Sequence, residues 1–217
     1  MSEIPLCYEN VLKHKCVMTQ LIFLPGASGS TDFWTPLAVK IQDYPDQKIV
    51  AYPAFANEQA HDDVQDFSSL SRYVLDHIQD ECIIIAQSMG GIFAVQAALE
   101  KPEQVKGLVL IATSGGIDMT AFQVEDWRTA YQQQYLDYPD WFSTVKLDYA
   151  TQLENIRQPV LLLWGDADFI SPVAVGEFLQ QQLASSSLHV IAGGDHLFAS
   201  SHADICAVHI SAFLKQF

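Results

Sequence analysis

Short apolar runs recur along the chain and alternate with segments in which apolar residues return every three or four positions. Each run is continuous rather than alternating, as expected for strands that are covered on both faces. The runs occupy residues 21–24, 48–51, 82–86, 108–112 and 160–164, with a weaker sixth at 188–191. This pattern predicts six buried strands in a mostly parallel sheet.

The segments between the runs predict helices. Residues 67–78 carry apolar side chains at helical spacing, and residues 90–99 are apolar nearly all round. The second pattern predicts a deeply buried helix that Pro102 ends. Strand–helix alternation of this kind favours an α/β fold with helices on both faces of the sheet.

Two more helix starts are predicted towards the C-terminus. Ser171 and Pro172 are expected to be the N-cap and the first helical position of one helix. The spacing Ser201-x-x-Asp204 is that of a capping box and could begin the last helix.

The segment 114–155 breaks the alternation, because it contains no buried apolar run. It holds eight aromatic residues, and Trp127, Tyr131 and Tyr135 stand at helical spacing within it. We interpret it as a short helical cap insertion over the carboxyl edge of the sheet, attached to the core mainly by its aromatic residues. At 217 residues the chain is about one domain long, so residues 1–217 are predicted to form a single domain that contains this cap.

The chain is strongly acidic. It has 11 Lys and Arg residues against 26 Asp and Glu residues, which gives a net charge of −15. A surface of this sign repels phosphate backbones and anionic lipid headgroups. We therefore expect binding neither to nucleic acid nor to a membrane.

The ends of the chain and its cysteines indicate a cytoplasmic protein. The first ten residues lack the basic and apolar regions of a signal peptide, and no apolar run approaches the ~18 residues of a membrane-spanning helix. Cys7, Cys16, Cys82 and Cys206 form no CxxC pair, which argues against a structural zinc site or a redox dithiol. Cys82 and Cys206 are expected to be inert thiols of the core.

Ser88 follows the buried run 82–86 and precedes the predicted buried helix. On such a strand-to-helix turn the serine hydroxyl stands clear of the sheet, and the next amide lies at the positive end of the helix. Ala86-x-Ser88-x-Gly90 differs from the usual G-x-S-x-G pattern only in its first residue, where alanine, which is also small, replaces glycine. The alternative is that Ser88 is an ordinary helix N-cap.

Two further polar residues follow later strands. Asp168 comes after the run 160–164, and His196 comes after the run 188–191. The carboxyl ends of parallel strands meet at one edge of a sheet, where ligands bind. A serine becomes a good nucleophile near pH 7 only with a histidine base that a carboxylate orients. We therefore expect Ser88, Asp168 and His196 to form a catalytic triad.

Other residues compete for each of these roles. Asp166 and, less readily, Asp118 could supply the carboxylate. The alternatives to the proposed base and nucleophile lie within a strand, on the last helix or in loops without a strand-to-helix turn: His61, His189, His202, His209, Ser28, Ser30 and Ser114.

At these residues the sequence resembles the α/β-hydrolase superfamily, most closely its small single-domain serine esterases with a short helical cap. The resemblance runs from about Gln20 to the C-terminus. It implies that Ser88 is the nucleophile, that Asp168 is the acid of the G-x-x-D turn that starts at Gly165, and that His196 is the histidine of the late Gly-x-His segment. In that segment the position before the histidine, often glycine in the family, is Asp195.

The resemblance also implies an oxyanion hole. Leu24-Pro25-Gly26-Ala27 matches the oxyanion loop, although the family usually has His-Gly where this chain has Pro-Gly. The backbone N–H groups of Ala27 and Met89 would then stabilise the developing oxyanion, at roughly 3–4 kcal/mol each. For the substrate pocket we expect one residue near this loop, three in or near the cap and one beside His196: Trp34, Phe122, Trp127, Tyr131 and Leu197.

The expected activity is hydrolysis of a small carboxylic ester through an acyl-enzyme, with no metal and no organic cofactor. Family members that carry Asp at the elbow are dehalogenases and epoxide hydrolases, and Ser88 argues against that chemistry. Alternative activities within the same fold are those of a thioesterase, a carbon–carbon bond hydrolase or lyase, an acyl-carrier methyl ester esterase or a menaquinone-pathway enzyme. The last alternative is a non-catalytic protein that binds a ligand. The partner would be a small-molecule ester, and the chain a monomer or a homodimer.

Charge favours a neutral or cationic ester over an acidic carrier. The segment 114–155 has only Arg128 and Lys146 as basic residues against a larger set of acidic ones. An anionic substrate would meet repulsion at such a surface.

Overall fold

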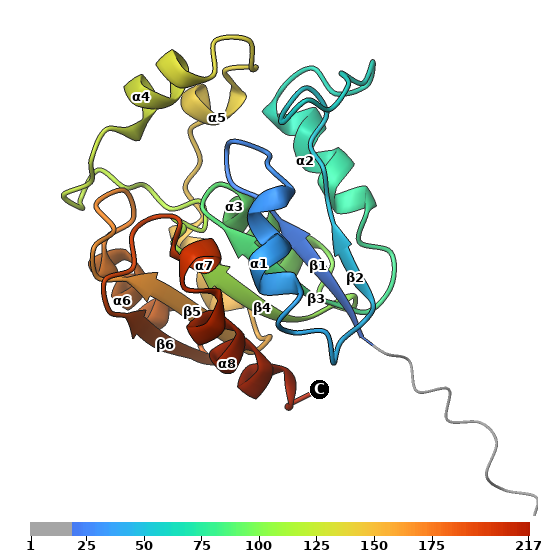
Figure 1. Ribbon diagram of the computed structural model, residues 1–217, viewed down its shortest axis with the longest axis vertical. Helices are drawn as coiled ribbons and strands as arrows, with labels where there is room; N and C mark the ends of the chain where they lie inside the picture. Colours follow the sequence, from blue (N-terminus) through green and yellow to red (C-terminus); the bar gives the residue numbers. More distant parts are fainter. Residues whose placement is uncertain (1–18) are drawn as a thin grey trace, which may run out of the picture.

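The computed structural model describes residues 19–217, which contain one sheet of six parallel strands. The strand order is β2-β1-β3-β4-β5-β6 (Figure 1). The strands are β1 (Gln20–Leu24), β2 (Gln47–Ile49), β3 (Cys82–Gln87), β4 (Val105–Ile111), β5 (Val160–Gly165) and β6 (Ser186–Ile191). Each strand overlaps one of the six apolar runs, so the predicted α/β fold is confirmed.

Helices cover both faces of the sheet (Figure 1). One face is covered by α1 (Thr35–Ala38), α7 (Phe198–Ser201) and α8 (Ala203–Leu214). The other is covered by α2 (Phe67–Asp76), α3 (Gly90–Glu100) and α6 (Val173–Gln182). The remaining helical segments are η1 (Asp32–Trp34), α4 (Trp127–Gln134), α5 (Trp141–Thr144) and η2 (Ala150–Asn155).

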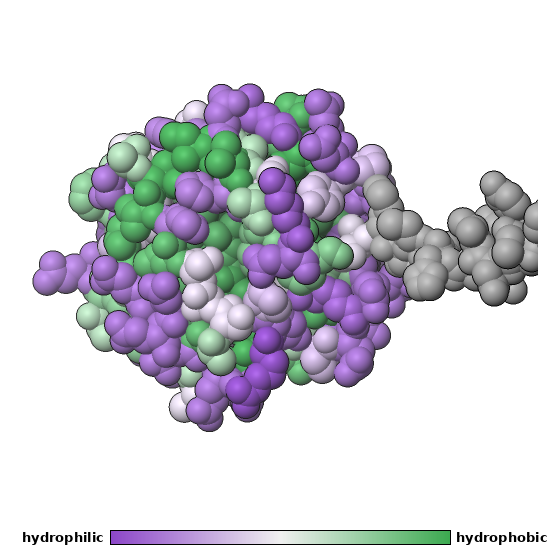
Figure 2. Space-filling model, turned by 90° about the horizontal axis from the view of Figure 1, so that it is seen from below, coloured by the Kyte–Doolittle hydropathy of each residue, from purple (hydrophilic) through white to green (hydrophobic). Residues whose placement is uncertain are grey.

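The end of the molecule opposite α4 and α5 is seen in Figure 2. Hydrophilic residues cover most of it, and hydrophobic residues gather on one side. Exposed apolar side chains on β6 and α8 include Val190, Ile205 and Val208. Within residues 19–217, no helix is both long and apolar enough to cross a membrane.

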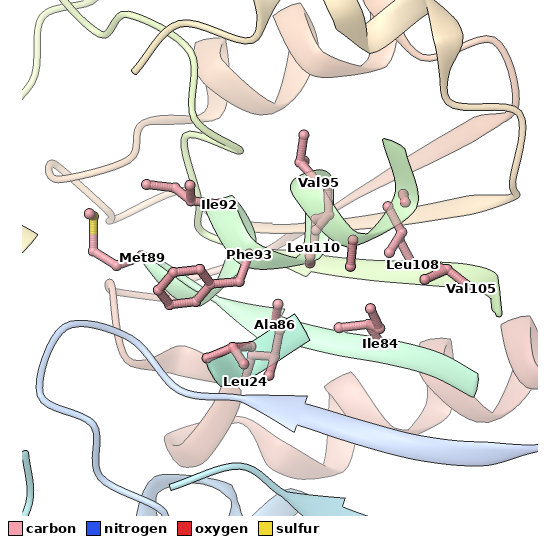
Figure 3. Close-up of a cluster of buried hydrophobic side chains, with 14 of the residues drawn as sticks. Leu24, Ile84, Ala86, Met89, Ile92, Phe93, Val95, Val105, Leu108 and Leu110 are labelled. Atoms are coloured by element: carbon pink, nitrogen blue, oxygen red, sulfur yellow. The ribbon is translucent and has the colours of Figure 1, made fainter. Parts of the chain in front are cut away.

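Neighbouring residues of a strand enter opposite halves of the core. On β3, Ile84 and Ala86 pack on the side of α3, whereas Ile83 and Ile85 pack on the side of α8. Figure 3 shows the α3 half, in which side chains of β3 and β4 meet those of the helix. This two-sided burial explains why the inner strands appear in the sequence as continuous apolar runs. The prediction that all six strands are buried is wrong for β2 and β6, which stand at the two edges of the sheet: no residue of β2 and only Ile191 of β6 is buried.

An aromatic cluster joins the buried helix α3 to other parts of the chain. The Phe93 ring on α3 lies 5.2 Å from Phe67 on α2, 5.6 Å from Tyr52 and 6.0 Å from Phe142 on α5, measured between ring centroids. Burying a side chain of this size stabilises a fold by roughly 1.5–3 kcal/mol. The cluster therefore anchors α5 to the core of the sheet.

The residues 114–155, which we call the cap, contain less helix than their spacing predicts. Helix α4 covers only Trp127–Gln134, because the backbone leaves helical geometry at Tyr135, where φ is −120° and ψ is 62°. The rings of Tyr135 and Tyr138 then stack, with centroids 4.7 Å apart. In Figure 1, α4 and α5 stand beyond the ends of the strands. That the cap is an insertion in a single domain stays a prediction.

Both predicted helix starts near the C-terminus are wrong by a short distance. The N-cap of α6 is Pro172 itself, in extended conformation, and the hydroxyl oxygen of Ser171 accepts a hydrogen bond from Nε1 of Trp164 instead. The capping box at Ser201 does not form: Ser201 ends α7, and α8 begins at Ala203 after His202. The Asp204 carboxylate instead forms an ion pair with Lys40, which follows α1.

Two of the four cysteines lie in the described part of the chain. Cys82 and Cys206 are buried and unpaired thiols, as predicted. Cys7 and Cys16 lie outside the described residues, as do the first ten residues on which the interpretation of the N-terminus rests.

Candidate active site

Ser88 stands at the carboxyl end of β3, on the turn that leads into α3. Its backbone φ is 51°, a left-handed conformation that non-glycine residues rarely adopt. Its N–H donates to the carbonyl oxygen of Ile111 at 3.0 Å, and its own carbonyl accepts a hydrogen bond from the Thr113 hydroxyl. The surrounding strands therefore hold this strained turn in place.

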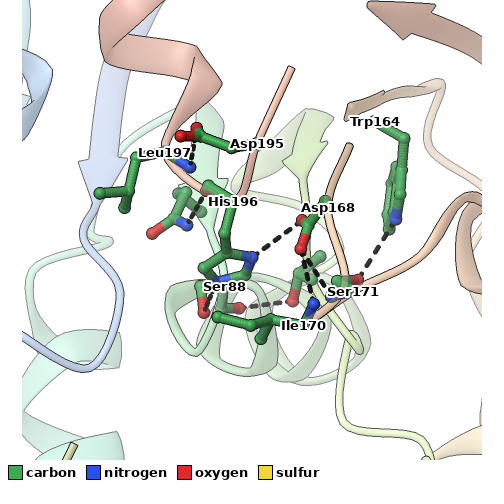
Figure 4. Close-up of polar contacts among 10 residues, drawn as sticks. Ser88, Trp164, Asp168, Ile170, Ser171, Asp195, His196 and Leu197 are labelled. Carbon is green, nitrogen blue, oxygen red and sulfur yellow. Dashed lines mark hydrogen bonds and ion pairs between the residues drawn. The ribbon is translucent and has the colours of Figure 1, made fainter. Parts of the chain in front are cut away.

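His196 and Asp168 complete a hydrogen-bonded chain with Ser88 (Figure 4). The Oγ of Ser88 lies 2.9 Å from Nε2 of His196, and Nδ1 of His196 lies 2.8 Å from Oδ2 of Asp168. The three residues are far apart in sequence and come from the ends of three strands. The structure thus brings together the three side chains that the sequence placed at one edge of the sheet.

Asp168 is a buried carboxylate with hydrogen bonds to both of its oxygens. It is 3% exposed, and its Oδ1 accepts hydrogen bonds from the backbone N–H groups of Ile170 and Ser171, each at 2.9 Å. Its Oδ2 remains for His196. Such an arrangement fixes both the direction of the carboxylate and the tautomer of the histidine, with the proton on Nδ1.

The competing acids bond to groups other than His196, and the competing histidines contact groups other than Ser88. Asp166 accepts a hydrogen bond from the Gly193 N–H, and Asp118 caps its own turn at Thr120. The four other histidines considered contact neighbours other than Ser88: His61 at Asp63, His189 and His209 against each other, and His202 at Ser201. Asp195, at the position where glycine was expected, accepts from the Leu197 N–H at 2.9 Å and so shapes the turn beside His196.

The loop that carries Ala27 packs directly against the Ser88 turn. A Cβ on Gly26 would lie 3.2 Å from Cβ of Ser88, and a Cβ on Gly90 would lie 2.5 Å from the carbonyl oxygens of Leu24 and Pro25. Only glycine permits both approaches. Among the described residues, the N–H groups of Ala27 and Met89 donate no hydrogen bond within the chain. Both amides are thus available to an acceptor near Ser88.

Gln87 is a site residue that the sequence reasoning missed. It is 3% exposed, and its side-chain N–H donates to the carbonyl oxygen of His196 at 3.0 Å. The only signal in the sequence is a polar residue at the end of an otherwise apolar strand, directly before Ser88.

A cavity of about 820 Å³ opens beside Ser88 and His196. Its apolar wall comes from α3, the cap and the loop after β5, and includes Ile92, Val145 and Ile170. Four ionisable cap residues also line it: Asp118, Arg128, Lys146 and Asp148. Their formal charges cancel, so the cavity is less acidic than the chain as a whole.

Two of the five predicted pocket residues line the cavity, and three do not. Phe122 and Trp127 line the cavity. Trp34 does not, because it is fully buried on the opposite face of the sheet, 5.3 Å from the Phe23 ring. Leu197 is 56% exposed and lies outside the cavity wall, and Tyr131 points to the Ala27 loop instead. For these three, the expectation of a place in the pocket is corrected.

Comparison with known sequences gives a family match over most of the described chain. The profile of the alpha/beta hydrolase fold matches residues 19–155. A pimeloyl-[acyl-carrier protein] methyl ester esterase of Shewanella woodyi is 33% identical, with 91% of this chain and 94% of that protein covered. A poly(3-hydroxyalkanoate) depolymerase of Ectopseudomonas oleovorans is 25% identical, with 92% and 85% covered.

Solved structures share the same fold. A thermophilic esterase from Thermogutta terrifontis superposes with a TM-score of 0.73 at 15% identity, with 91% of this chain and 90% of that chain covered. At such identity the similarity concerns the fold alone.

Proposed function

Because the chain belongs to the alpha/beta hydrolase fold family, we propose that it is a serine hydrolase that cleaves a small carboxylic ester through an acyl-enzyme. The observation that carries this proposal is the hydrogen-bonded chain from Ser88 through His196 to Asp168. One relative supports an ester as the substrate class, because the Shewanella woodyi protein is named as a methyl ester esterase.

In the first half of the reaction, Oγ of Ser88 attacks the ester carbonyl while Nε2 of His196 takes the hydroxyl proton. The carbonyl oxygen becomes an oxyanion that the N–H groups of Ala27 and Met89 would stabilise. Asp168 stabilises the imidazolium and keeps it in place. When the tetrahedral intermediate collapses, the carbon–oxygen bond to the alcohol breaks, and His196 gives its proton to the departing alkoxide.

The second half repeats these steps with water. His196 takes a proton from the water that attacks the acyl group on Ser88. A second oxyanion forms in the same place, and its collapse breaks the bond to Oγ. The acid leaves, and Ser88 recovers its proton from His196.

The cavity supports an ester without net charge. Its volume of about 820 Å³ lies within the range of small-molecule sites, and its two basic and two acidic residues balance each other. The net acidity of the whole cap also argued against an anionic substrate. Most of the acidic residues of the cap lie outside the cavity wall, however, so the balance of charges in the cavity is the argument that applies to the substrate.

An acyl-carrier methyl ester is the second candidate, favoured by the 33% identity to the Shewanella woodyi relative. The rates at which the protein hydrolyses the two kinds of ester distinguish the two candidates. Turnover of an acyl-carrier-bound methyl ester well above that of free short-chain esters would favour this candidate over the first.

The test of the proposed function is the hydrolysis of p-nitrophenyl esters by Ser88→Ala. We expect kcat to fall by at least about 10³-fold. Ser114→Ala is the matched control, because Ser114 lines the same cavity but its hydroxyl oxygen accepts a hydrogen bond from the Gly116 N–H rather than contacting His196. Hydrolysis by Ser88→Ala at the native rate would contradict the proposal.

A further inference from the structure

Two tyrosine hydroxyls from different parts of the chain hold the loop that carries Ala27. Tyr52, which follows β2, donates to the carbonyl oxygen of Pro25 at 2.8 Å. Tyr131, on the cap helix α4, donates to the carbonyl oxygen of Ala27 at 2.9 Å. These carbonyls flank the peptide that contains the Ala27 N–H. The two hydrogen bonds therefore fix the direction in which that N–H points.

The two anchors differ in what supports them. Tyr52 belongs to the core: it is fully buried, and its ring lies 5.6 Å from that of Phe93. Tyr131 belongs to the cap, where its ring lies 5.0 Å from that of Tyr135. Burial raises the pKa of Tyr131, and the neighbouring Tyr135 and Tyr138 raise it further. Its hydroxyl therefore stays protonated near neutral pH and remains a donor.

The helix that carries Tyr131 also contacts the cavity. Trp127 lies one turn earlier on α4 and lines the cavity wall, and its ring is 5.6 Å from that of Tyr131. A group that fills the cavity beside Trp127 thus packs against the same helix that anchors Ala27.

We propose that Tyr131 is a positioning residue that couples closure of the cap over a bound ester to the organisation of the oxyanion hole. The inference rests on the proposed function. While a substrate packs against Trp127, α4 stays in place and Tyr131 keeps the Ala27 N–H aimed at the reacting carbonyl. If the cap lifts, the loop keeps Tyr52 but loses its second anchor. The contact between the substrate and the cap thereby stabilises the transition state more than it stabilises the bound substrate.

Tyr131→Phe tests the coupling, because it keeps the ring and removes the hydroxyl. Tyr138→Phe is the matched control: the Tyr138 hydroxyl accepts a hydrogen bond from the Ala56 N–H at 2.9 Å, so it also joins the cap to the core, but it does not bond to either carbonyl that flanks the Ala27 N–H. Thermal unfolding of both variants establishes that they are folded.

For Tyr131→Phe we expect kcat to fall about tenfold with KM within twofold, since a loosened oxyanion donor costs less than the roughly 10²–10³-fold loss of a deleted one. Affinity for a trifluoromethyl ketone, which forms a tetrahedral oxyanion on serine, is expected to fall by the same factor as kcat. Tyr138→Phe is expected to keep both values within twofold of native.

Two results would overturn the inference. Equal losses in both variants would mean that the hydroxyls only attach the cap, and an unchanged kcat in Tyr131→Phe would mean that Ala27 needs no second anchor. In either case a native protein that hydrolyses esters leaves the proposed function intact. A native protein that neither hydrolyses esters nor binds the ketone overturns the proposed function and this inference together.

Discussion

The side-chain amide of Gln87 donates a hydrogen bond to the backbone carbonyl oxygen of His196, across 3.0 Å and 109 residues of sequence. The residue directly before the proposed nucleophile therefore holds the backbone of the proposed base. This bond ties the end of β3 to the loop after β6, so the distance from Ser88 to His196 depends on it.

Gln87→Met is expected to lower kcat while leaving KM nearly unchanged. Methionine keeps the length of the side chain but cannot donate, so His196 loses a restraint, and the free energy of unfolding falls by about 1 kcal/mol. Gln96→Met is the control, since Gln96 bonds only to Ser71 and Glu100 at a distance from the site. Steady-state kinetics and urea unfolding measure both effects. A loss of stability without a loss in kcat would show that the bond is structural only.

Asp168→Asn is expected to lower kcat by about 10⁴-fold, as loss of the orienting carboxylate does in serine triads. The amide can still occupy the buried site, but it no longer stabilises the imidazolium. Asp166→Asn, two residues earlier, changes a carboxylate that bonds only to the Gly193 N–H and is expected to keep most activity. A larger loss for Asp166→Asn than for Asp168→Asn would reassign the acid.

Ser88→Gly is expected to be more stable than Ser88→Ala by about 1 kcal/mol. Both variants lose the hydroxyl and its contact with His196, but only glycine adopts the φ of 51° without strain. The measurement is the free energy of unfolding of the two inactive proteins in urea. Equal stabilities would show that the turn stores no strain.

Cys82 and Cys206 are expected to resist alkylation in the native protein. Burial raises the pKa of each thiol to about 12, although Lys101 partly opposes the shift at Cys82. The reactive thiolate is therefore scarce at pH 8. Peptide mapping after iodoacetamide treatment should find both cysteines unmodified in buffer and modified in denaturant. Rapid modification of either one in buffer would contradict the buried placement.

The strands and the placement of Ser88, Asp168 and His196 could be predicted from the sequence because both depend on a strong local signal. Ile83 and Ile84 enter opposite halves of the core, so an inner strand such as β3 appears as an unbroken apolar run. Asp168 and His196 follow such runs directly, and parallel topology then brings the strand ends to one edge.

The pocket and the helix starts could not be predicted in the same way, because they depend on contacts between distant segments. Trp34 closely follows the loop that carries Ala27, yet its side chain is buried in the core beside Phe23. Tyr131 shares its helix with Trp127 but contacts the Ala27 backbone rather than the cavity. Ser171 is of a residue type that often caps helices, but its hydroxyl oxygen accepts a hydrogen bond from Nε1 of Trp164 instead.

The most direct test of the account is the site at which a fluorophosphonate reacts. We expect mass spectrometry of the digested native protein to find the phosphonyl group on the peptide that contains Ser88, and to find no adduct on Ser88→Ala. A native protein that stays unlabelled, or one labelled at Ser114 instead, would contradict the assignment of Ser88 as the nucleophile.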